Sequence, residues 1–70
     1  MECLNQLEKI CGDNRINISI FFCGRGRWWD LQLERIGTHK SGWKDEIIFH
    51  NRDNDLDVLV KEAIDCYEST

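Results

Sequence analysis

The sequence lacks any segment that would place the chain in or across a membrane. No apolar run approaches the roughly 20 residues needed to span a bilayer. The first residues, Met1 to Asn5, contain neither a basic segment nor an apolar core, so no secretory signal is expected. We therefore expect a complete small gene product that resides in the cytoplasm and has no membrane partner.

The sequence also lacks a metal-binding or disulfide motif. Four cysteines are spread along it: Cys3, Cys11, Cys23 and Cys66. No CxxC pair occurs, and His39 and His50 add possible ligands but no recognisable spacing. On one helix Cys3 and Cys11 would lie about 12 Å apart along the axis, too far for a bridge or a shared ion. We expect free thiols in a reducing compartment, with no metal and no cofactor.

Catalytic motifs are missing as well. No glycine-rich phosphate loop follows a strand and opens a helix, because Gly24 and Gly26 lie in a hairpin turn. Neither His39 nor His50 has a sequence context that implies a nucleophile or a metal pair. A fold of 70 residues also has little room for a pocket of roughly 300 Å³ or more. We therefore expect no enzymatic activity and no catalytic residues.

Composition and charge are those of one small globular domain, covering residues 1–70. Hydrophobic residues make up 41% and charged residues 31%, which excludes a disordered chain. Residues 1–43 hold six Lys or Arg against five Asp or Glu, whereas residues 44–70 hold three against eight. The net charge of −4 therefore comes from the last third, which suits a basic protein surface and disfavours a polyphosphate backbone.

The segment from Ile16 to Leu33 predicts a β-hairpin. Apolar and polar residues alternate on both sides of a break at residues 24–27. With a four-residue loop, one face pairs apolar residues throughout: Phe22 with Trp29, Ile20 with Leu31, and Ile18 with Leu33. We expect that face to be buried. The opposite face predicts a contact surface near the loop, formed by Phe21, Cys23, Trp28, Arg25 and Arg27.

The remaining elements follow from periodicity and from turn residues. Helical spacing predicts a helix over Glu2–Cys11, with Gly12 as its stop, and a second helix over Leu56–Tyr67, capped by Asp53 or Asp55. Between them we predict strands at Arg15–Cys23, Trp28–Arg35 and Trp43–His50, a loop at Ile36–Gly42 and a turn at Asn51–Asp55. In the third strand Ile47 and Phe49 share one side. The predicted class is α+β, in the order α-β-β-β-α: a three-stranded antiparallel meander with two helices packed on one face.

In element order and length this chain resembles double-stranded RNA-binding domains. That family carries a Lys-rich cluster at the start of its last helix to hold phosphates. The corresponding residues here, 53–57, have the sequence Asp-Asn-Asp-Leu-Asp and the opposite charge. The comparison therefore argues against duplex RNA binding.

These features together predict an acidic protein-binding module that acts sterically. Its general character is that of phage accessory proteins, such as anti-CRISPR-like inhibitors, which block a basic, nucleic-acid-binding surface of a host protein. The candidate partner-binding residues are Phe21, Arg25, Arg27, Trp28, Asp57, Glu62 and Asp65. Two alternatives remain open: a single-stranded nucleic-acid binder using Arg25, Arg27 and Trp28, and a homodimer that buries two sheet faces or edges.

Overall fold

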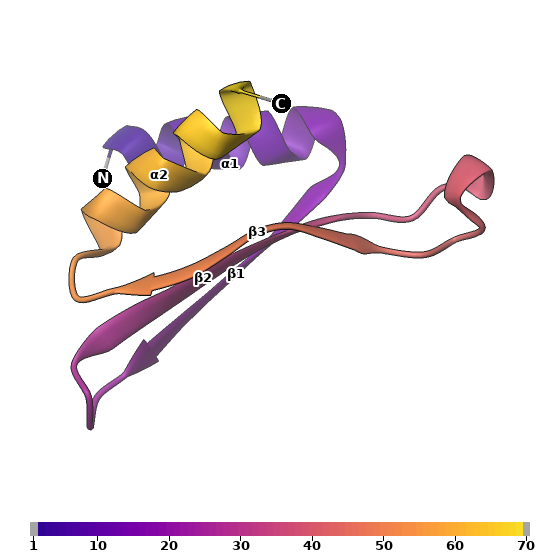
Figure 1. Ribbon diagram of the computed structural model, residues 1–70. Coiled ribbons are helices and arrows are strands. Elements are labelled where there is room, and N and C mark those ends of the chain that lie inside the picture. The colour runs from indigo at the N-terminus through magenta and orange to yellow at the C-terminus, as the bar shows by residue number, and fades with distance from the viewer. Residues whose placement is uncertain (1, 70) are drawn as a thin grey trace.

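The computed structural model describes residues 2–69 and all of their side chains except that of Ser41. Its elements follow the predicted α-β-β-β-α order, with a short 3-10 turn at His39–Ser41: α1 (Glu2–Asn14), β1 (Ile16–Cys23), β2 (Trp28–Arg35), β3 (Glu46–Asp53) and α2 (Leu56–Glu68). The strands form one antiparallel sheet in the order β1-β2-β3. Both helices cover the same face of this sheet (Figure 1). The predicted α+β class and the arrangement of the helices are therefore confirmed.

The first helix runs past its predicted end. Gly12 lies inside α1, which continues to Asn14, so the prediction of a stop at Gly12 is wrong. The helix ends instead where Arg15 adopts a left-handed backbone with φ of 58°. The Asn14 side chain also donates a hydrogen bond to the Ile10 carbonyl, 2.7 Å away. A glycine within a helix is tolerated here because it costs only about 1 kcal/mol.

The second helix follows the prediction closely. Asp55 is its N-cap, and the Asp55 carboxylate accepts a hydrogen bond from the backbone N–H of Asp57 at 2.9 Å. The buried stripe is the expected one: Leu59, Val60, Ala63 and Ile64. This stripe faces β2 and β3, and it supplies about half of the fully buried core.

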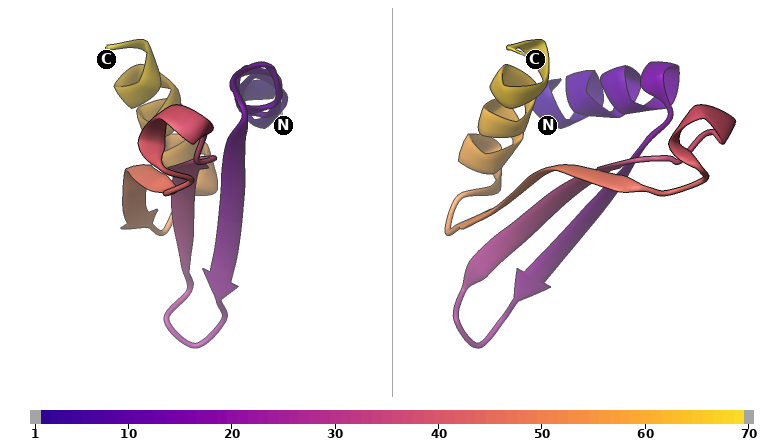
Figure 2. Two further views of the ribbon diagram at one scale, coloured as in Figure 1. Left: turned by 90° about the vertical axis from the view of Figure 1, so that its right-hand side faces the viewer. Right: turned by 45° about the vertical axis from the view of Figure 1, so that its right-hand side comes forward.

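The hairpin has the predicted register but not the predicted burial. Phe22 pairs with Trp29 and Ile20 with Leu31, as expected. However, Phe22 is 46% exposed and Ile20 38% exposed, so the expectation that this whole side is buried is wrong. The hairpin end of β1 and β2 diverges from the helix layer, so the helices do not cover it (Figure 2).

The third strand begins and ends three residues later than predicted, at Glu46 and Asp53. An irregularity opposite Leu33 and Glu34 inserts an extra residue, so that Ile48 and Phe49 both pack against the core. Ile47, predicted to lie on the same side as Phe49, is instead 58% exposed. The loop before β3 is correspondingly longer than predicted, and its residues 36–45 form an arm that projects away from the helices (Figure 1).

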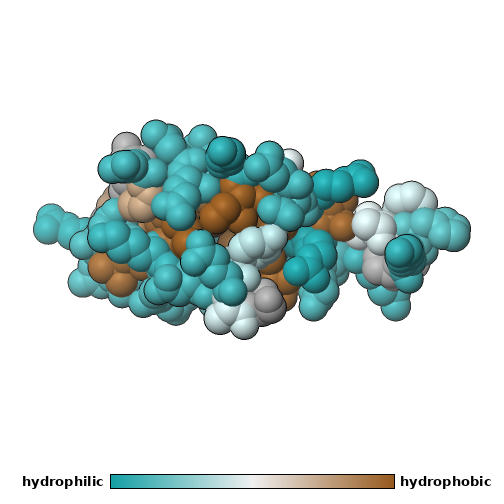
Figure 3. Space-filling model, turned by 90° about the horizontal axis from the view of Figure 1, so that it is seen from above, coloured by the Kyte–Doolittle hydropathy of each residue, from teal (hydrophilic) through white to brown (hydrophobic). Residues whose placement is uncertain are grey.

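The core lies between the sheet and the helix layer, which consists of α1 and α2. Leu31 and Leu33 on the central strand are fully buried, as is Leu7 on α1. Figure 2 shows α1 above β1 and α2 above β3. The outer surface of the helix layer is mostly hydrophilic, with apolar atoms visible between the helices (Figure 3). The opposite face of the sheet carries no helix in residues 2–69, and we call it the open face.

Candidate binding surface on the open face of the sheet

The strand registers bring five side chains of the open face together. Phe21 on β1 lies opposite Asp30 on β2, and Asp30 lies opposite Arg52 on β3. Trp28 and His50 belong to the same face, because they are two residues from Asp30 and from Arg52, respectively. We call these residues the open-face cluster. They span all three strands at the hairpin half of the sheet.

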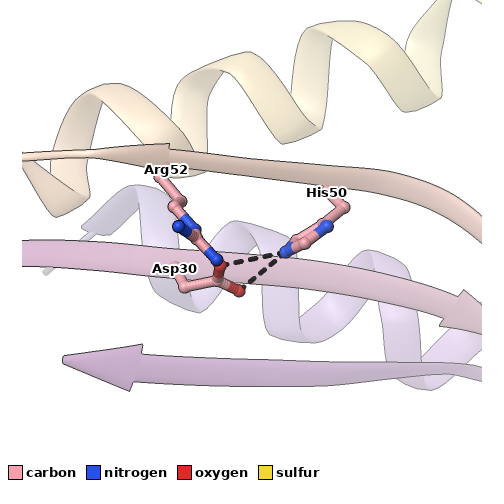
Figure 4. Close-up of polar contacts among 3 residues, drawn as sticks. All are labelled: Asp30, His50 and Arg52. Atoms are coloured by element: carbon pink, nitrogen blue, oxygen red, sulfur yellow. Dashed lines mark hydrogen bonds and ion pairs between the residues drawn. The ribbon is translucent and has the colours of Figure 1, made fainter. Parts of the chain in front are cut away.

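Asp30 is the polar centre of the cluster (Figure 4). The Nε2 atom of His50 lies 3.0 and 2.9 Å from the two carboxylate oxygens, and Nε of Arg52 donates to Oδ2 at 3.0 Å. Partial burial raises the pKa of the Asp30 carboxyl group, but the hydrogen bonds and charges of His50 and Arg52 outweigh this effect. The pKa of Asp30 is therefore below its ordinary value, and the carboxylate is ionised at neutral pH.

The aromatic half of the cluster is stacked against its arginine. The Arg52 guanidinium lies over the Trp28 ring, 4.5 Å from the ring centroid, and the Phe21 ring centroid is 6.0 Å from that of Trp28. Phe21 is 60% exposed, whereas Trp28 is half-buried. The cluster thus presents an aromatic and cationic surface, with one exposed phenyl ring at its border.

The hairpin turn, residues 24–27, packs against the same tryptophan. A Cβ atom at Gly26 would collide with the Trp28 indole, so only glycine permits this approach. Arg27 has a left-handed backbone with φ of 56°, and its amide donates to the Cys23 carbonyl at 2.7 Å. Arg25 and Arg27 are exposed, and neither makes an ion pair within residues 2–69. Positive charge is therefore available beside the aromatic rings, as the sequence predicted.

The predicted acidic residues on α2 lie on the other side of the molecule. Asp57 accepts a hydrogen bond from the Cys3 thiol at 2.7 Å and pairs with Lys61 at 2.9 Å. The first contact, followed by the second, lowers the pKa of Asp57, and the same thiol contact raises the pKa of Cys3. Glu62 accepts a hydrogen bond from Asn51 at 2.9 Å, whereas Asp65 is exposed. Two of the three predicted acids are thus already bonded within the domain.

Charge is segregated between the helix layer and the rest of the domain. Residues 2–14 and 53–68, which form the helix layer, the last residue of β3 and the turn before α2, contain nine Asp or Glu and two Lys. Residues 15–52, which form β1, β2, the arm and most of β3, contain seven Lys or Arg and four Asp or Glu. The candidate partner-binding residues predicted from the sequence include both the aromatic residues of the hairpin and the acidic residues of α2. The structure does not bring them together, since they lie on opposite faces of the sheet.

The cysteines are free thiols in separate environments. Cys11 is buried in the core, and this burial raises the pKa of its thiol. Cys66 donates toward the Ile48 carbonyl at 3.8 Å, and the Cys23 sulfur accepts from the Gly26 amide at 3.5 Å. Within residues 2–69, no group of three His, Cys, Asp or Glu side chains could hold a metal ion. None of the described helices combines the length and apolar character needed to cross a membrane.

Two surface hollows are larger than the length of the chain suggested. One of about 340 Å³ lies between the C-terminal end of α2 and the start of β3, and it is lined by Leu33, Arg35, Glu46, Ile47, Ile48, Phe49, Cys66 and Tyr67. Another of about 330 Å³ lies where α1 meets the first turns of α2. The expectation that the domain has little room for a hollow of roughly 300 Å³ or more is therefore wrong. The first hollow is floored by apolar side chains and bordered by the Arg35–Glu46 ion pair.

Sequence reasoning missed three members of the open-face cluster: Asp30, His50 and Arg52. It placed the third strand too early, and this obscured the fact that residues 50 and 52 lie beside residue 30. The sequence carried no signal for this extension, because residues 50–53 are all polar and the alternation of apolar and polar residues stops at Phe49. No family model, curated protein or solved structure matches this chain.

We expect Asp30→Asn to lower stability in a pH-dependent way. Because the folded-state pKa of Asp30 is lowered, its carboxylate stabilises the fold above the pKa of the unfolded chain, about 3.9. This contribution disappears as the pH falls through the folded-state pKa. Thermal melts at pH 7 should therefore show a lower melting temperature for Asp30→Asn than for the wild type, and the difference should shrink below about pH 4.

The control for this variant is Asp65→Asn, which removes an exposed carboxylate outside the cluster. It should not reproduce the pH-dependent loss. An equal loss for Asp30→Asn at pH 3 and pH 7 would contradict the stabilising role of the ionised carboxylate.

Proposed function

We propose that this chain is a non-enzymatic, cytoplasmic protein-binding module that occupies a basic, nucleic-acid-binding cleft of another protein. The observation that carries the proposal is the placement of two unlike surfaces on opposite faces of one thin domain. The open-face cluster offers aromatic and arginine side chains, the residue types most enriched in interface hot spots. The helix layer offers a strongly acidic surface.

The opposite placement of these surfaces favours a cleft over a flat partner. The helix layer and the open face lie on opposite sides of one sheet, in a domain that measures 39 × 24 × 18 Å. A flat partner would contact one face only. A cleft that binds a nucleic-acid strand has a basic wall, and this wall would attract the helix layer. The other wall would then contact the open-face cluster.

The mechanism in this proposal is steric and needs no chemical step. The acidic helix layer speeds association and orients the domain, since rim charges act mainly on the on-rate. Phe21 and Trp28 supply the short-range binding energy by entering apolar recesses of the partner. Nucleic acid is then excluded from the occupied cleft. This is the mode of action we propose for an inhibitory accessory protein of the phage anti-defence type.

Trp28→Ala is expected to weaken partner binding by about 30-fold, or about 2 kcal/mol. Truncation removes both the stacking surface of Arg52 and the support of the exposed Phe21 ring. The experiment captures partners from a lysate of the native host with wild-type protein and identifies them by mass spectrometry. The purified partner is then titrated calorimetrically with each variant.

Trp43→Ala is the matched control, because Trp43 is 71% exposed but lies on the arm, outside the cluster. Its affinity should equal that of the wild type. The paired substitution Glu62→Lys with Asp65→Lys tests the second face, and it should slow association and weaken its salt dependence. Asp57 is left unchanged because of its bonds to Cys3 and Lys61. Unchanged affinity for Trp28→Ala would overturn the assignment of the open face.

A second candidate function is supported by one specific observation. Arg25, Arg27 and Arg52 all lie at the end of the sheet that carries Phe21 and Trp28. Stacking platforms flanked by arginines are typical of proteins that bind single-stranded nucleic acid. Titrations with single-stranded DNA and RNA at two salt concentrations distinguish the functions. If Trp28→Ala and Arg27→Ala weaken only these titrations, single-strand binding replaces the proposal above.

A further inference from the structure

The two edges of the sheet differ in how well they are protected. β1 is hydrogen-bonded to β2 on one side only, and Figure 2 shows no other element alongside its outer edge. Its eight residues, INISIFFC, contain no charged residue and no proline. Soluble proteins usually protect such edges with lysine, proline or a bulge, because the unpaired backbone N–H and C=O groups attract further strands.

The other edge strand carries the usual protection. β3 contains both acidic and basic residues, in the sequence EIIFHNRD, and it has the irregularity opposite Leu33 and Glu34. Of the two edge strands, only β1 therefore lacks these protective features. Its exposed side chains include Ile20 at 38%, Phe21 at 60% and Phe22 at 46%. An uncharged apolar edge of this length is suited to pairing with another strand.

We propose that β1 pairs with β1 of a second copy of this chain, forming a two-fold symmetric dimer with one continuous six-stranded sheet. An isologous contact requires a surface that is complementary to itself. β1 meets this requirement because an uncharged strand, paired antiparallel with its own copy, brings no like charges together. The helix layer and the arm carry most of the charge, so neither offers a comparable self-complementary edge.

Symmetry and strand alternation define how the dimer is arranged. In an antiparallel pair, residues directly opposite each other lie on the same face, so the axis must pass close to Ser19 or Ile20. With the axis at Ile20, Phe22 lies opposite Ile18 of the second copy. The apolar side chains left uncovered beyond the helices then cover one another. The two open-face clusters would then lie on one continuous sheet surface. Dimerisation through β1 goes beyond the function proposed above, because it does not depend on a partner protein.

Sedimentation velocity from about 1 µM to about 1 mM tests the dimer. The wild type should change from monomer to dimer within this range. Ser19→Lys places a charge next to the two-fold axis, where it approaches its own copy, and it should weaken dimerisation at least about tenfold. Gln32→Lys adds the same charge on the same face of the central strand, directly beside Ser19, and it should dimerise like the wild type.

Amide hydrogen exchange locates the interface. Raising the concentration should slow exchange in residues 16–23 and leave residues 46–53 unchanged. The proposal is overturned if the wild type stays monomeric, as it would if the edge accepts a strand of a different protein. It is also overturned if larger open-ended assemblies form, if Ser19→Lys dimerises normally, or if Gln32→Lys is equally impaired.

Discussion

Leu33→Ala is expected to destabilise the domain by about 3–5 kcal/mol. Leu33 is fully buried on the central strand, where it contacts the helix layer and lies opposite Ile18 and Phe49. Truncation to alanine leaves a cavity that the sheet cannot close, because strands on both sides hold β2 in place. A 70-residue domain has a total stability of roughly 4–10 kcal/mol, so this variant approaches the limit of folding. Urea denaturation followed by circular dichroism measures the loss.

Ile47→Ala is the appropriate control for Leu33→Ala. This substitution also shortens a branched aliphatic side chain, on the neighbouring strand β3. The Ile47 side chain, however, is 58% exposed. Its substitution should change the unfolding free energy by no more than about 0.5 kcal/mol. A comparable loss at both positions would mean that the open face is as well packed as the helix-covered face.

Gly37→Ala is expected to cost about 3 kcal/mol, at the upper end of the range for overpacking. A Cβ atom at Gly37 would lie 2.5 Å from the carbonyl carbon of Trp43 and 2.7 Å from the amide nitrogen of Lys44. These are backbone atoms, so no side-chain rotation relieves the collision. The Gly37 amide also donates to Asp45 at 2.6 Å, and the Trp43 amide donates to Thr38 at 2.9 Å. We expect the base of the arm to open.

Chemical denaturation gives the loss for Gly37→Ala, and faster amide exchange in residues 36–45 would locate it. Gly12→Ala is the matched control, since nothing lies within 4 Å of a Cβ at that position and Gly12 is inside α1. That variant should gain about 0.5–1 kcal/mol because alanine favours a helix. Unchanged stability and exchange for Gly37→Ala would contradict the close approach at the base of the arm.

Local periodicity was sufficient to predict most of the fold. The alternation on both sides of residues 24–27 predicted the register of β1 and β2, because a four-residue loop permits only one pairing with a consistent face. The spacing of Leu59, Val60, Ala63 and Ile64 predicted the buried stripe of α2, because residues at these intervals lie on one face of a helix. For the candidate site, the sequence identified the exposed Phe21 and the arginines of the hairpin turn.

The third strand shows where periodicity is insufficient. Its start depends on how the arm closes through Gly37 and Asp45, eight residues apart, and on the extra residue at Ile48. Neither feature follows from an apolar pattern. The partners of Asp30 could not be predicted for this reason: His50 and Arg52 come from a strand whose register with β2 is set by non-local contacts.

The sequence alone was enough to establish the order of the elements, the hairpin register and the acidic character of the C-terminal third, since each depends on residues that are close in the chain. The tertiary structure decided which of these residues meet. The hairpin end of β1 and β2 diverges from the helix layer, and Ile20 and Phe22 remain partly exposed. The helices pack on one face only, and so the acidic residues and the aromatic cluster lie on opposite sides of the sheet.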